Sequence, residues 1–453
     1  MKKTLFWLFC SFISLSVTAE TLSLSLSDRT YLENNPQAVE KLLSKNIYSL
    51  SEKELSFLTK LYQQYPDFNK YLALFAQGRV AFLKQDYAEA IRLYRQILTE
   101  KPELNPVRIE LAIALFHQRQ DKAARVQFEK AKMEKDLPYG SLLIINDYLQ
   151  VLEERQGWNI DFSMNYIRDK NVNNASDANR VPLSDRAVLM KSEKMQPQSA
   201  HGLGYSFSFS RDFNLFDSHY FLFGNRTWGK EYWDNHEYDD ILNRTFLGYA
   251  YKNASHIIKV KPFYERRWYG NHRYRWNNGI QAEYDFQFNP HWQLSYSAEF
   301  EKQHYFIEKE LNGHLTQLTP TLIFQPNTRQ FFYIGGDWIN EKTQVRQYGS
   351  KSKGLRLGWG QDWGKGISSQ IAVSFIKRNY KDIAKLGNLD IFSFNKNRKD
   401  RIYSLNLLVW KRDWHLWGIT PKLQFIWKKQ ISNIPQMYSY QQKNINLIFE
   451  KSF

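Results

Sequence analysis

The sequence predicts a chain of two unlike parts, an N-terminal array of helical repeats followed by a transmembrane, antiparallel β-barrel. Three observations support this. Apolar residues recur three and four positions apart as far as residue 156, and from residue 158 they alternate with polar ones. Aromatic residues make up 16% of a chain whose mean hydropathy is only −0.59. A barrel explains the last two observations together, because lipid-facing apolar residues alternate with polar residues in its lumen.

The first 19 residues predict a secretory signal peptide. Lys2 and Lys3 precede an apolar run that ends in small residues, and cleavage is expected after Ala19. The alternative, an uncleaved N-terminal anchor, is disfavoured because the apolar run is short for a bilayer span. The only cysteine, Cys10, lies inside this segment, so we expect no disulfide and no cysteine metal site in the mature chain.

The predicted organisation is a signal peptide at 1–19, a periplasmic helical-repeat domain at 20–157 and a barrel at 158–453. Residues 21–157 carry 19 basic and 18 acidic side chains, whereas residues 158–453 carry 41 and 27. The excess positive charge therefore belongs to the second region. In an exported chain it favours attraction to anionic lipopolysaccharide or to an acidic client over nucleic-acid binding. A solvated set of loop charges explains it equally well.

A period of 34 residues within the helical region is typical of tetratricopeptide repeats, in which small residues lie where two helices touch. Turns are predicted at 84–87 and 118–121, a degenerate helix pair before Pro66, and a closing helix at 142–152. Such an array usually presents a groove to protein segments. The residues expected to pack the repeats, without a further role, are Gly78, Ala90, Tyr94, Ile97, Pro102, Ala112, Ala124, Phe128 and Ala131.

From residue 158 onwards, segments of about ten residues alternate as the strands of a membrane barrel do. Clear examples are 158–166, 203–209, 280–286, 292–300, 355–359, 371–375, 405–409 and 419–427. Counting along the chain gives fourteen strands, of which the third, eighth and ninth alternate poorly. A soluble β-sandwich would also alternate, but the polar faces here are rich in Gly, Ser and Asn, which favours a lumen.

The last predicted strand, 445–453, ends the chain on an aromatic residue. Phe449 and Phe453 share its apolar side, and we expect them to form the terminal signal used in barrel closure and assembly. A closed barrel leaves no strand edge in lipid. The strand is therefore expected to pair with the first strand, at 158–166.

Charged residues that alternate with apolar ones are expected to point into the lumen. Two interpretations remain open. The charges line a client path or hold an internal plug, or they pair across the wall and stabilise a wet interior. The candidates are Asp161, Lys259, Lys261, Glu283, Asp285, Glu299, Glu301, Arg356 and Lys422.

With both halves considered, the chain resembles the surface lipoprotein assembly modulators, the Slam family, over nearly all of its mature length. The resemblance is most specific in residues 107–116 (VRIELAIALF), in Tyr348 with 354–364 (GLRLGWGQDWG), and in 418–423 (GITPKL). It implies a periplasmic tetratricopeptide domain and a fourteen-stranded outer-membrane barrel. It also implies a translocon or modulator that delivers particular lipoproteins, or soluble haem-binding proteins, to the cell surface.

The resemblance further implies clients that carry a C-terminal β-barrel-like domain. Additional expected partners are periplasmic chaperones, the barrel-assembly machinery, and outer-membrane lipid or lipopolysaccharide, but no nucleic acid. Three routes remain open for the client: the lumen, a lateral seam between the first and last strands, or recruited assembly machinery. The seam is attractive because an exposed strand edge can pair with a β-rich client.

Other function classes are less well supported. The ten histidines show no metal-ligand spacing, and neither a Gly-x-Ser-x-Gly elbow nor a phosphate loop occurs. We therefore expect no catalytic residue, no cofactor and no metal. Two rival functions are a porin-like exporter of polysaccharide or another solute, and a surface receptor or adhesin that binds through the loop at 168–200.

Overall fold

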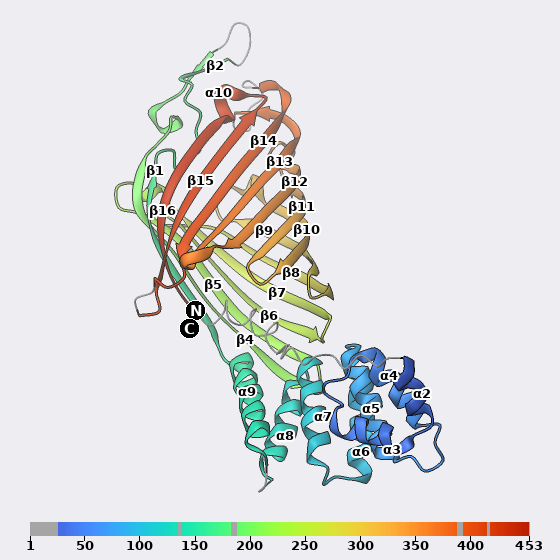
Figure 1. Cartoon of the computed structure of the whole chain (residues 1–453). Helices are drawn as coiled ribbons and strands as arrows, with labels where there is room; N and C mark the ends of the chain where they lie inside the picture. The colour runs from blue at the N-terminus through green and yellow to red at the C-terminus, as the bar shows by residue number, and fades with distance from the viewer. Residues whose placement is uncertain (1–25, 135–136, 183–187, 387–392, 415–416, 453) are drawn as a thin grey trace.

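The computed structural model describes residues 26–134, 137–182, 188–386, 393–414 and 417–452. The predicted signal peptide, with Cys10, and the terminal Phe453 lie outside these residues. Helices come first and strands follow (Figure 1). The N-terminal helices are α2 (Leu26–Glu33), α3 (Pro36–Lys45), α4 (Glu52–Tyr62), α5 (Lys70–Leu83), α6 (Tyr87–Glu100), α7 (Asn105–His117), α8 (Asp121–Lys132) and α9 (Tyr139–Gln156).

Fourteen antiparallel strands of the described chain close into one barrel, in the order β1-β16-β15-β14-β13-β12-β11-β10-β9-β8-β7-β6-β5-β4. They are β1 (Asn159–Asp169), β4 (Ala200–Phe216), β5 (His219–Tyr232), β6 (Asp240–Lys252), β7 (His256–Tyr269), β8 (His272–Asn289), β9 (Trp292–Tyr305), β10 (Gly313–Asn327), β11 (Gln330–Thr343), β12 (Ser350–Asp362), β13 (Ile367–Lys385), β14 (Ser393–Lys411), β15 (Thr420–Ser432) and β16 (Tyr440–Ser452). The predicted fold class is confirmed.

Polar side chains cap the helices of the N-terminal domain. Ser51 and Glu54 form a capping box at the start of α4: the Ser51 amide donates to Glu54 Oε2 at 3.0 Å, and the Glu54 amide donates to the Ser51 hydroxyl at 3.4 Å. Asn69 and Asp86 accept from amides in the first turns of α5 and α6. These residues fix where the helices begin.

The turns inside two successive helix pairs have the same backbone conformation. Gln85 lies between α5 and α6, and Arg119 lies between α7 and α8, one predicted repeat further on. Each has a φ of 62°, in the left-handed region that residues other than glycine rarely adopt. The repeat therefore extends from the packing residues to the backbone of the turn.

The predicted packing residues lie mainly in the core of this domain. Pro102 differs, because it is exposed in the turn after α6, where its ring prevents the helix from continuing. Gly78 is buried in α5 against Tyr94 of α6, and a Cβ atom at Gly78 would lie 2.4 Å from Cε1 of that ring. The fully buried members are Ala90, Tyr94, Ile97, Ala112, Ala124, Phe128 and Ala131.

The barrel presents apolar side chains outward. Ile280 of β8 and Phe300 of β9 are register partners, and each is 52% exposed. Leu355 and Leu357 of β12 alternate with Arg356 in the same manner. A side-chain period of two places every second residue of a strand on the same face, so these residues identify the outer face of their strands. None of the described helices is long and apolar enough to cross a membrane.

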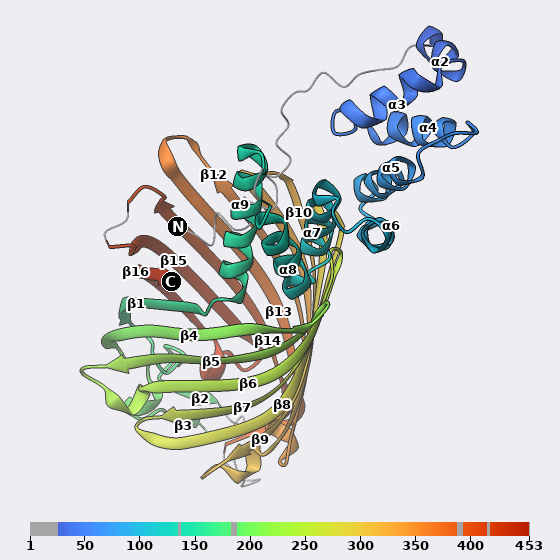
Figure 2. The same cartoon turned by 90° about the horizontal axis from the view of Figure 1, so that it is seen from below.

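The two ends of the barrel differ. The helical domain lies at the end where β1 begins, here called the near end (Figure 1). At the opposite, far end, longer connections carry the hairpin of β2 (Arg180–Pro182) and β3 (Val188–Met190), and α10 (Pro435–Tyr438). Val181 packs there with Ala384, Phe394 and Ile434. The loop predicted at 168–200 is thus partly folded onto the far end. Seen from the near end, α7, α8 and α9 overlap the barrel, whereas α2 to α4 extend beyond it (Figure 2).

We predict that Gly78→Ala destabilises the helical domain, because the added methyl group must displace the buried ring of Tyr94. Overpacking costs about 1–3 kcal/mol, and the better helix propensity of alanine returns only about 1 kcal/mol. Thermal unfolding of the helical circular dichroism signal of the full chain measures the difference. Gly140→Ala is the matched control, since a Cβ atom at Gly140 in α9 meets nothing within 4 Å. Equal midpoints for the two variants would contradict this packing argument.

Candidate functional site

A buried joint connects the helical domain to the near end of the barrel. Asp121 begins α8, Arg155 lies in the last turn of α9, and Tyr220 lies next to the start of β5. Asp121 Oδ1 accepts from Arg155 Nη1 at 2.9 Å, and Asp121 Oδ2 accepts from the Tyr220 hydroxyl at 2.7 Å. Asp121 and Tyr220 are 2% and 3% exposed. The carboxylate is therefore satisfied by one group from its own domain and one from the barrel.

Several contacts offset the energetic cost of burying the Arg155 guanidinium. Its Nη1 atom also donates to the Phe116 carbonyl at 3.2 Å, and its Cζ atom lies 3.7 Å from the centroid of the Phe116 ring. Such cation–π contact strengthens when the pair is removed from water. These contacts offset the loss of water around the buried guanidinium, which also donates to Asp121.

Further contacts extend the joint along the turn between β4 and β5. The Lys122 amide donates to Asn214 Oδ1 at 3.1 Å, and its Nζ donates to the Leu215 carbonyl at 3.0 Å. Ser218 Oγ donates to the Gln118 carbonyl at 2.8 Å. Because β4 is the neighbour of β1 in the barrel, the joint holds the helical array beside the first strand.

Sequence reasoning found Asp121 only as part of a predicted turn and did not single out Arg155 or Tyr220. One signal was available. The third strand of the count, β5, alternates poorly because Tyr220 and Leu222 place large buried groups on the inner side. Together with Ala250 they form a small core at the near end. An apolar inner face at one end of a lumen strand is the pattern that a docked domain produces.

Two ionisable groups of helix α7 are buried in the helical domain, and one of them, His117, lies near this joint. His117 stacks on Tyr87, with ring centroids 5.0 Å apart, and burial together with the charge of Arg155 lowers the pKa of His117 to about 4. Burial also raises the pKa of Glu110, although Arg79 at 3.4 Å opposes this rise. His117 is therefore neutral at ordinary pH and packs as an aromatic ring.

The lumen candidates of β9 belong to a charged network. Arg244 of β6 lies 2.7 Å from Glu265 of β7 and 3.0 Å from Glu299 of β9. Two strands separate β6 from β9, a distance of about 14 Å along the sheet. A direct contact across that distance requires side chains that meet over the concave face, so these groups lie inside the barrel. Glu301 joins the network through Asn277 at 3.2 Å.

The remaining lumen candidates have local partners. Lys259 and Lys261 both contact Glu283, at 3.4 and 2.5 Å. Arg356 pairs with Asp337 at 2.9 Å, and Lys422 pairs with Glu450 at 2.8 Å.

Asp285 accepts from Ser295 Oγ at 2.7 Å, and Asp161 is the register partner of Ser208 and Ser452. The structure thus brings Glu299 and Glu301 into one cluster and distributes the other candidates around the wall. Both interpretations of these charges, a client path or plug and the stabilisation of a wet interior, remain predictions.

Sequence reasoning missed Arg244, Glu265 and Arg275, although they make the centre of the network. Arg275 Nη2 lies 3.4 Å from Glu265 Oε1, and Glu265 is 3% exposed. Their strands contain charged and aromatic residues on both faces near the far end, so alternation alone did not separate lumen from lipid there. Within the described residues, no three His, Cys, Asp or Glu side chains group closely enough to hold a metal ion.

The seam between β1 and β16 closes the barrel by a short ladder. The predicted pairing of first and last strands is observed, but it includes only five residue pairs, from Asp161↔Ser452 to Asn165↔Ile448. On their other sides, β1 and β4 pair through eleven residues, as do β15 and β16. Every barrel ladder other than the seam has at least eleven described pairs.

Toward the far end, the seam is bridged by a side chain. Gln442 Nε2 donates to the Asn171 carbonyl at 2.8 Å and lies 3.3 Å from Asp169 Oδ1. Between this bridge and the ladder, Ile445 of β16 is 68% exposed. From the near end to the far end, the seam therefore consists of the five-pair ladder, a stretch without described pairs, and the polar bridge of Gln442. Phe449, predicted as part of the closure signal, pairs with Met164 inside the ladder.

These features define a class of protein: a membrane β-barrel with a tetratricopeptide domain fixed at one mouth. The model of the family "Surface lipoprotein assembly modifier" matches residues 158–453, and the model of its N-terminal tetratricopeptide repeats matches residues 25–128. The chain belongs to this family. It is an outer-membrane protein, so its near end is the periplasmic end and its far end faces the cell exterior.

Curated relatives match almost the full chain. A "Surface lipoprotein assembly modifier" from Pasteurella multocida is 34% identical, covering 97% of this chain and 87% of the relative. "Surface lipoprotein assembly modifier 2" from Haemophilus influenzae is 32% identical, covering 95% and 87%. A "Hemophilin secretion modulator" from Acinetobacter baumannii is 24% identical, covering 96% and 90%.

We predict that Tyr220→Phe loosens the joint without disturbing the barrel. The variant removes the hydroxyl that donates to Asp121 and leaves a buried carboxylate oxygen with one partner fewer, a loss of about 1–3 kcal/mol. Limited proteolysis should release the helical domain faster, while heat-modifiable migration of the barrel stays unchanged. Tyr264→Phe is the control, because Tyr264 is 48% exposed on the outer face of β7. Equal release from both variants would show that the hydroxyl does not hold the joint.

Proposed function

We propose that this chain promotes the delivery of specific lipoproteins, or of haem-binding proteins, to the cell surface, as the names of its relatives describe for them. The single observation that carries the proposal is the buried joint at Asp121, which fixes a protein-binding type of helical array at the periplasmic mouth of an outer-membrane barrel. A helical array of this type presents an extended surface for binding protein segments, which supports a protein client over a small solute.

We propose a separate role for the helical domain and for the barrel. The tetratricopeptide array gathers a client, or a periplasmic chaperone that escorts the client, and the barrel offers the route outward. Barrel-assembly machinery is a further proposed partner at the membrane. The role that we propose is translocation without catalysis, because it consists of binding and folding steps and includes no covalent change.

We propose further that the client uses the β1–β16 seam. Opening this seam breaks a five-pair ladder, whereas opening any neighbouring ladder breaks at least eleven described pairs. The freed edges of β1 and β16 can then pair with a strand of a β-rich client, which replaces the hydrogen bonds that opening removes. The short ladder supports this route over passage through the lumen.

We predict that the chain is necessary and sufficient, in a laboratory Gram-negative host, for surface exposure of a lipoprotein encoded next to its gene. Protease shaving of intact cells measures exposure, and a periplasmic marker reports on envelope integrity. With the chain, the lipoprotein should be cleaved, and without it the lipoprotein should remain protected. Unchanged protection in both strains, together with glycan export or ion conductance, would support a porin-like exporter instead.

A second prediction tests the seam itself. In the double variant Asn165→Cys/Ile448→Cys, register partners across the seam are joined by a disulfide, since paired Cα atoms lie about 4.5–5.5 Å apart and disulfides span about 4.4–6.8 Å. Oxidation should reduce client display to the level seen without the chain, and reduction should restore it.

The matched control is Ile426→Cys/Asn444→Cys, which joins register partners of β15 and β16 and leaves the seam free. It should display the client normally when oxidised. Normal display with the seam locked would exclude the lateral route and leave the proposed delivery role intact. The described residues contain no native cysteine that could pair with either set.

A further inference from the structure

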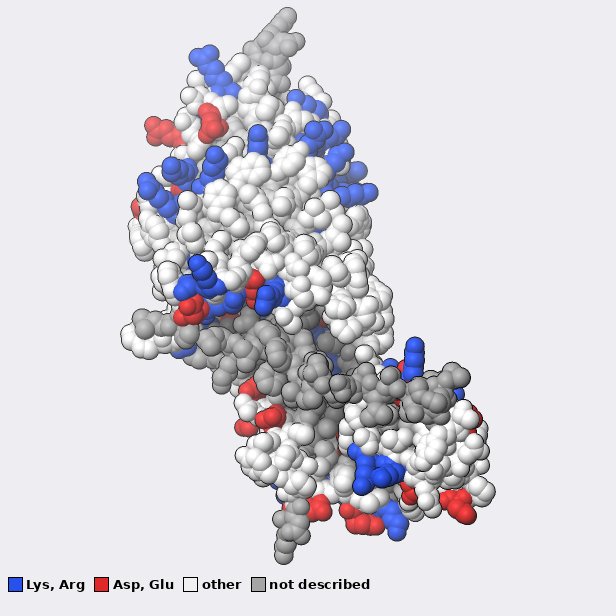
Figure 3. All heavy atoms as spheres, in the orientation of Figure 1, with Lys and Arg blue, Asp and Glu red and all other residues white. Residues whose placement is uncertain are grey.

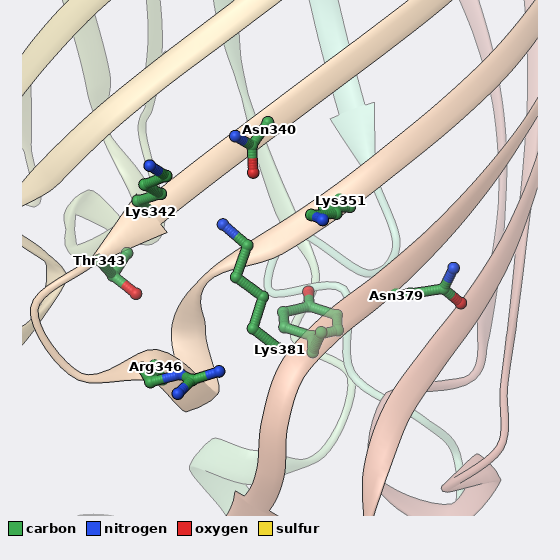
Figure 4. Close-up of a pocket in the computed structure, with 8 residues that line it drawn as sticks. Asn340, Lys342, Thr343, Arg346, Lys351, Asn379 and Lys381 are labelled. Carbon is green, nitrogen blue, oxygen red and sulfur yellow. The ribbon is translucent and has the colours of Figure 1, made fainter.

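A basic hollow of about 660 Å³ lies at the far end of β11, β12 and β13. Lys342 comes from the end of β11, Arg346 from the connection to β12, Lys351 from the start of β12 and Lys381 from β13. Figure 4 shows Lys381 extending across toward β11, between Arg346 and Lys351. Four cationic side chains from three strands and one loop therefore converge on one space.

The hollow lies on the outer face of the barrel. Lys351 is the register partner of both Asn340 and Asn379, so the three residues form one row across the strands. On β12, Lys351 shares its face with Leu355 and Leu357, which are each 46% exposed on the lipid side. The basic groups thus continue the lipid-facing surface toward the cell exterior and do not belong to the lumen.

These cations lack the partners that the lumen cations have. Among the described residues, Lys342, Arg346, Lys351 and Lys381 form no ion pair with a carboxylate within 4.0 Å. Lys381 Nζ donates instead to the backbone carbonyl of Glu341 at 2.5 Å. Repulsion between converging, unpaired cations opposes this arrangement, and an anion in the hollow would relieve that repulsion.

The nearest acids do not fill the hollow. The side chain of Glu341 points to the other face of β11 and accepts from Ser350 Oγ at 3.4 Å. Asp382, one residue after Lys381, accepts from the amide of Ile383 at 2.8 Å. The site is therefore cationic, with amide groups of Asn340 and Asn379 as additional donors.

The hollow is the centre of a wider basic belt. Figure 3 shows Lys and Arg gathered along the upper right edge of the barrel, at the end opposite the helical domain. Outward-facing basic residues near the far ends of β9, β12, β13 and β14 are exposed, and their register partners place them above the apolar band. They are Lys302, Lys353, Lys377, Lys399 and Arg401.

We propose that this hollow binds the phosphate groups of a lipid in the outer leaflet, namely the phosphorylated lipid A part of lipopolysaccharide. Arg346 supplies a planar fork that suits phosphate, and the lysines supply point charges around it. The acyl chains of the same molecule lie against the apolar band below, where Leu355 pairs with Phe375. Only a ligand that is anionic at one end and apolar at the other matches both surfaces.

This assignment does not depend on the proposed delivery role. It gives the barrel a fixed lipid contact on one side, and three strands (β13, β14 and β15) separate β12 from β16 at the seam. A lipid bound in the hollow therefore leaves the seam clear. The sequence located the excess basic charge only to residues 158–453. The proposed site explains part of that charge as a lipid-binding hollow on β11 to β13.

The test uses the full chain, delipidated in detergent, with bisphosphorylated lipid A as the probe and native mass spectrometry as the readout. The combined variant Lys342→Gln, Arg346→Gln, Lys351→Gln, Lys381→Gln should bind lipid A at least about tenfold more weakly, since each basic group contributes separately to attraction by an anionic lipid. The matched control Lys41→Gln, Lys45→Gln, Lys53→Gln, Lys60→Gln removes the same charge from exposed positions of the helical domain and should bind as the parent does.

Two further probes identify the ligand. Dephosphorylated lipid A should bind the parent chain as weakly as lipid A binds the variant, and millimolar inorganic phosphate should not displace lipid A. Equal binding by the variant and the parent, or equal binding of dephosphorylated lipid A, would overturn the proposal. Complete displacement by inorganic phosphate would also overturn it, since the hollow would then be a phosphate site and not a lipid site.

A measurement without substitutions guards against a variant that fails to fold. Addition of lipid A to the parent chain should slow hydrogen exchange in residues 340–351 and leave the β4–β5 turn unchanged. Unchanged exchange at 340–351 despite lipid A binding would place the lipid elsewhere and would refute this site.

Discussion

Closure of the barrel is the constraint on which the rest of this structure depends. In lipid, a backbone N–H or C=O group without a partner costs several kcal/mol, so the first strand must meet the last. Here that obligation is met by the ladder with the fewest described pairs, five between β1 and β16, and the Gln442 side chain bridges the seam toward the far end. The seam at which the chain must close is therefore also the place where separation would break the fewest described ladder pairs.

Strand alternation then decides where charge can be placed. A strand has only two faces, so each charged residue lies either in the lumen or toward lipid and its headgroups. Inside, Arg244 pairs with both Glu265 and Glu299 across the concave wall. Outside, Lys351 and its basic neighbours lie above the apolar band without carboxylate partners among the described residues. The same chemical groups are thus paired inside the lumen and lie without described carboxylate partners on the outer face.

The fold could be predicted from the sequence because both of its periods are local. A period of 34 residues located Ala112 and Ala124 in the core, and a period of two located fourteen strands. The ends of the strands were harder to predict from the sequence. Residues 280–286 were predicted, whereas β8 spans His272–Asn289, since charged and aromatic residues are mixed before residue 280 and the simple alternation disappears there.

Contacts between distant segments could not be predicted from the sequence either. Asp121 contacts Tyr220, and Arg244 contacts Glu299, only after the chain has folded.

The joint and the seam are linked by their places in the barrel. Asp121 and Lys122 hold the β4–β5 turn, β4 pairs along its length with β1, and α9 leads directly into β1. The helical array is therefore attached both to the strand that forms one wall of the seam and to the turn beside that strand. Because the attachment is buried, with Asp121 satisfied from both domains, this placement is a property of the fold and does not depend on the client.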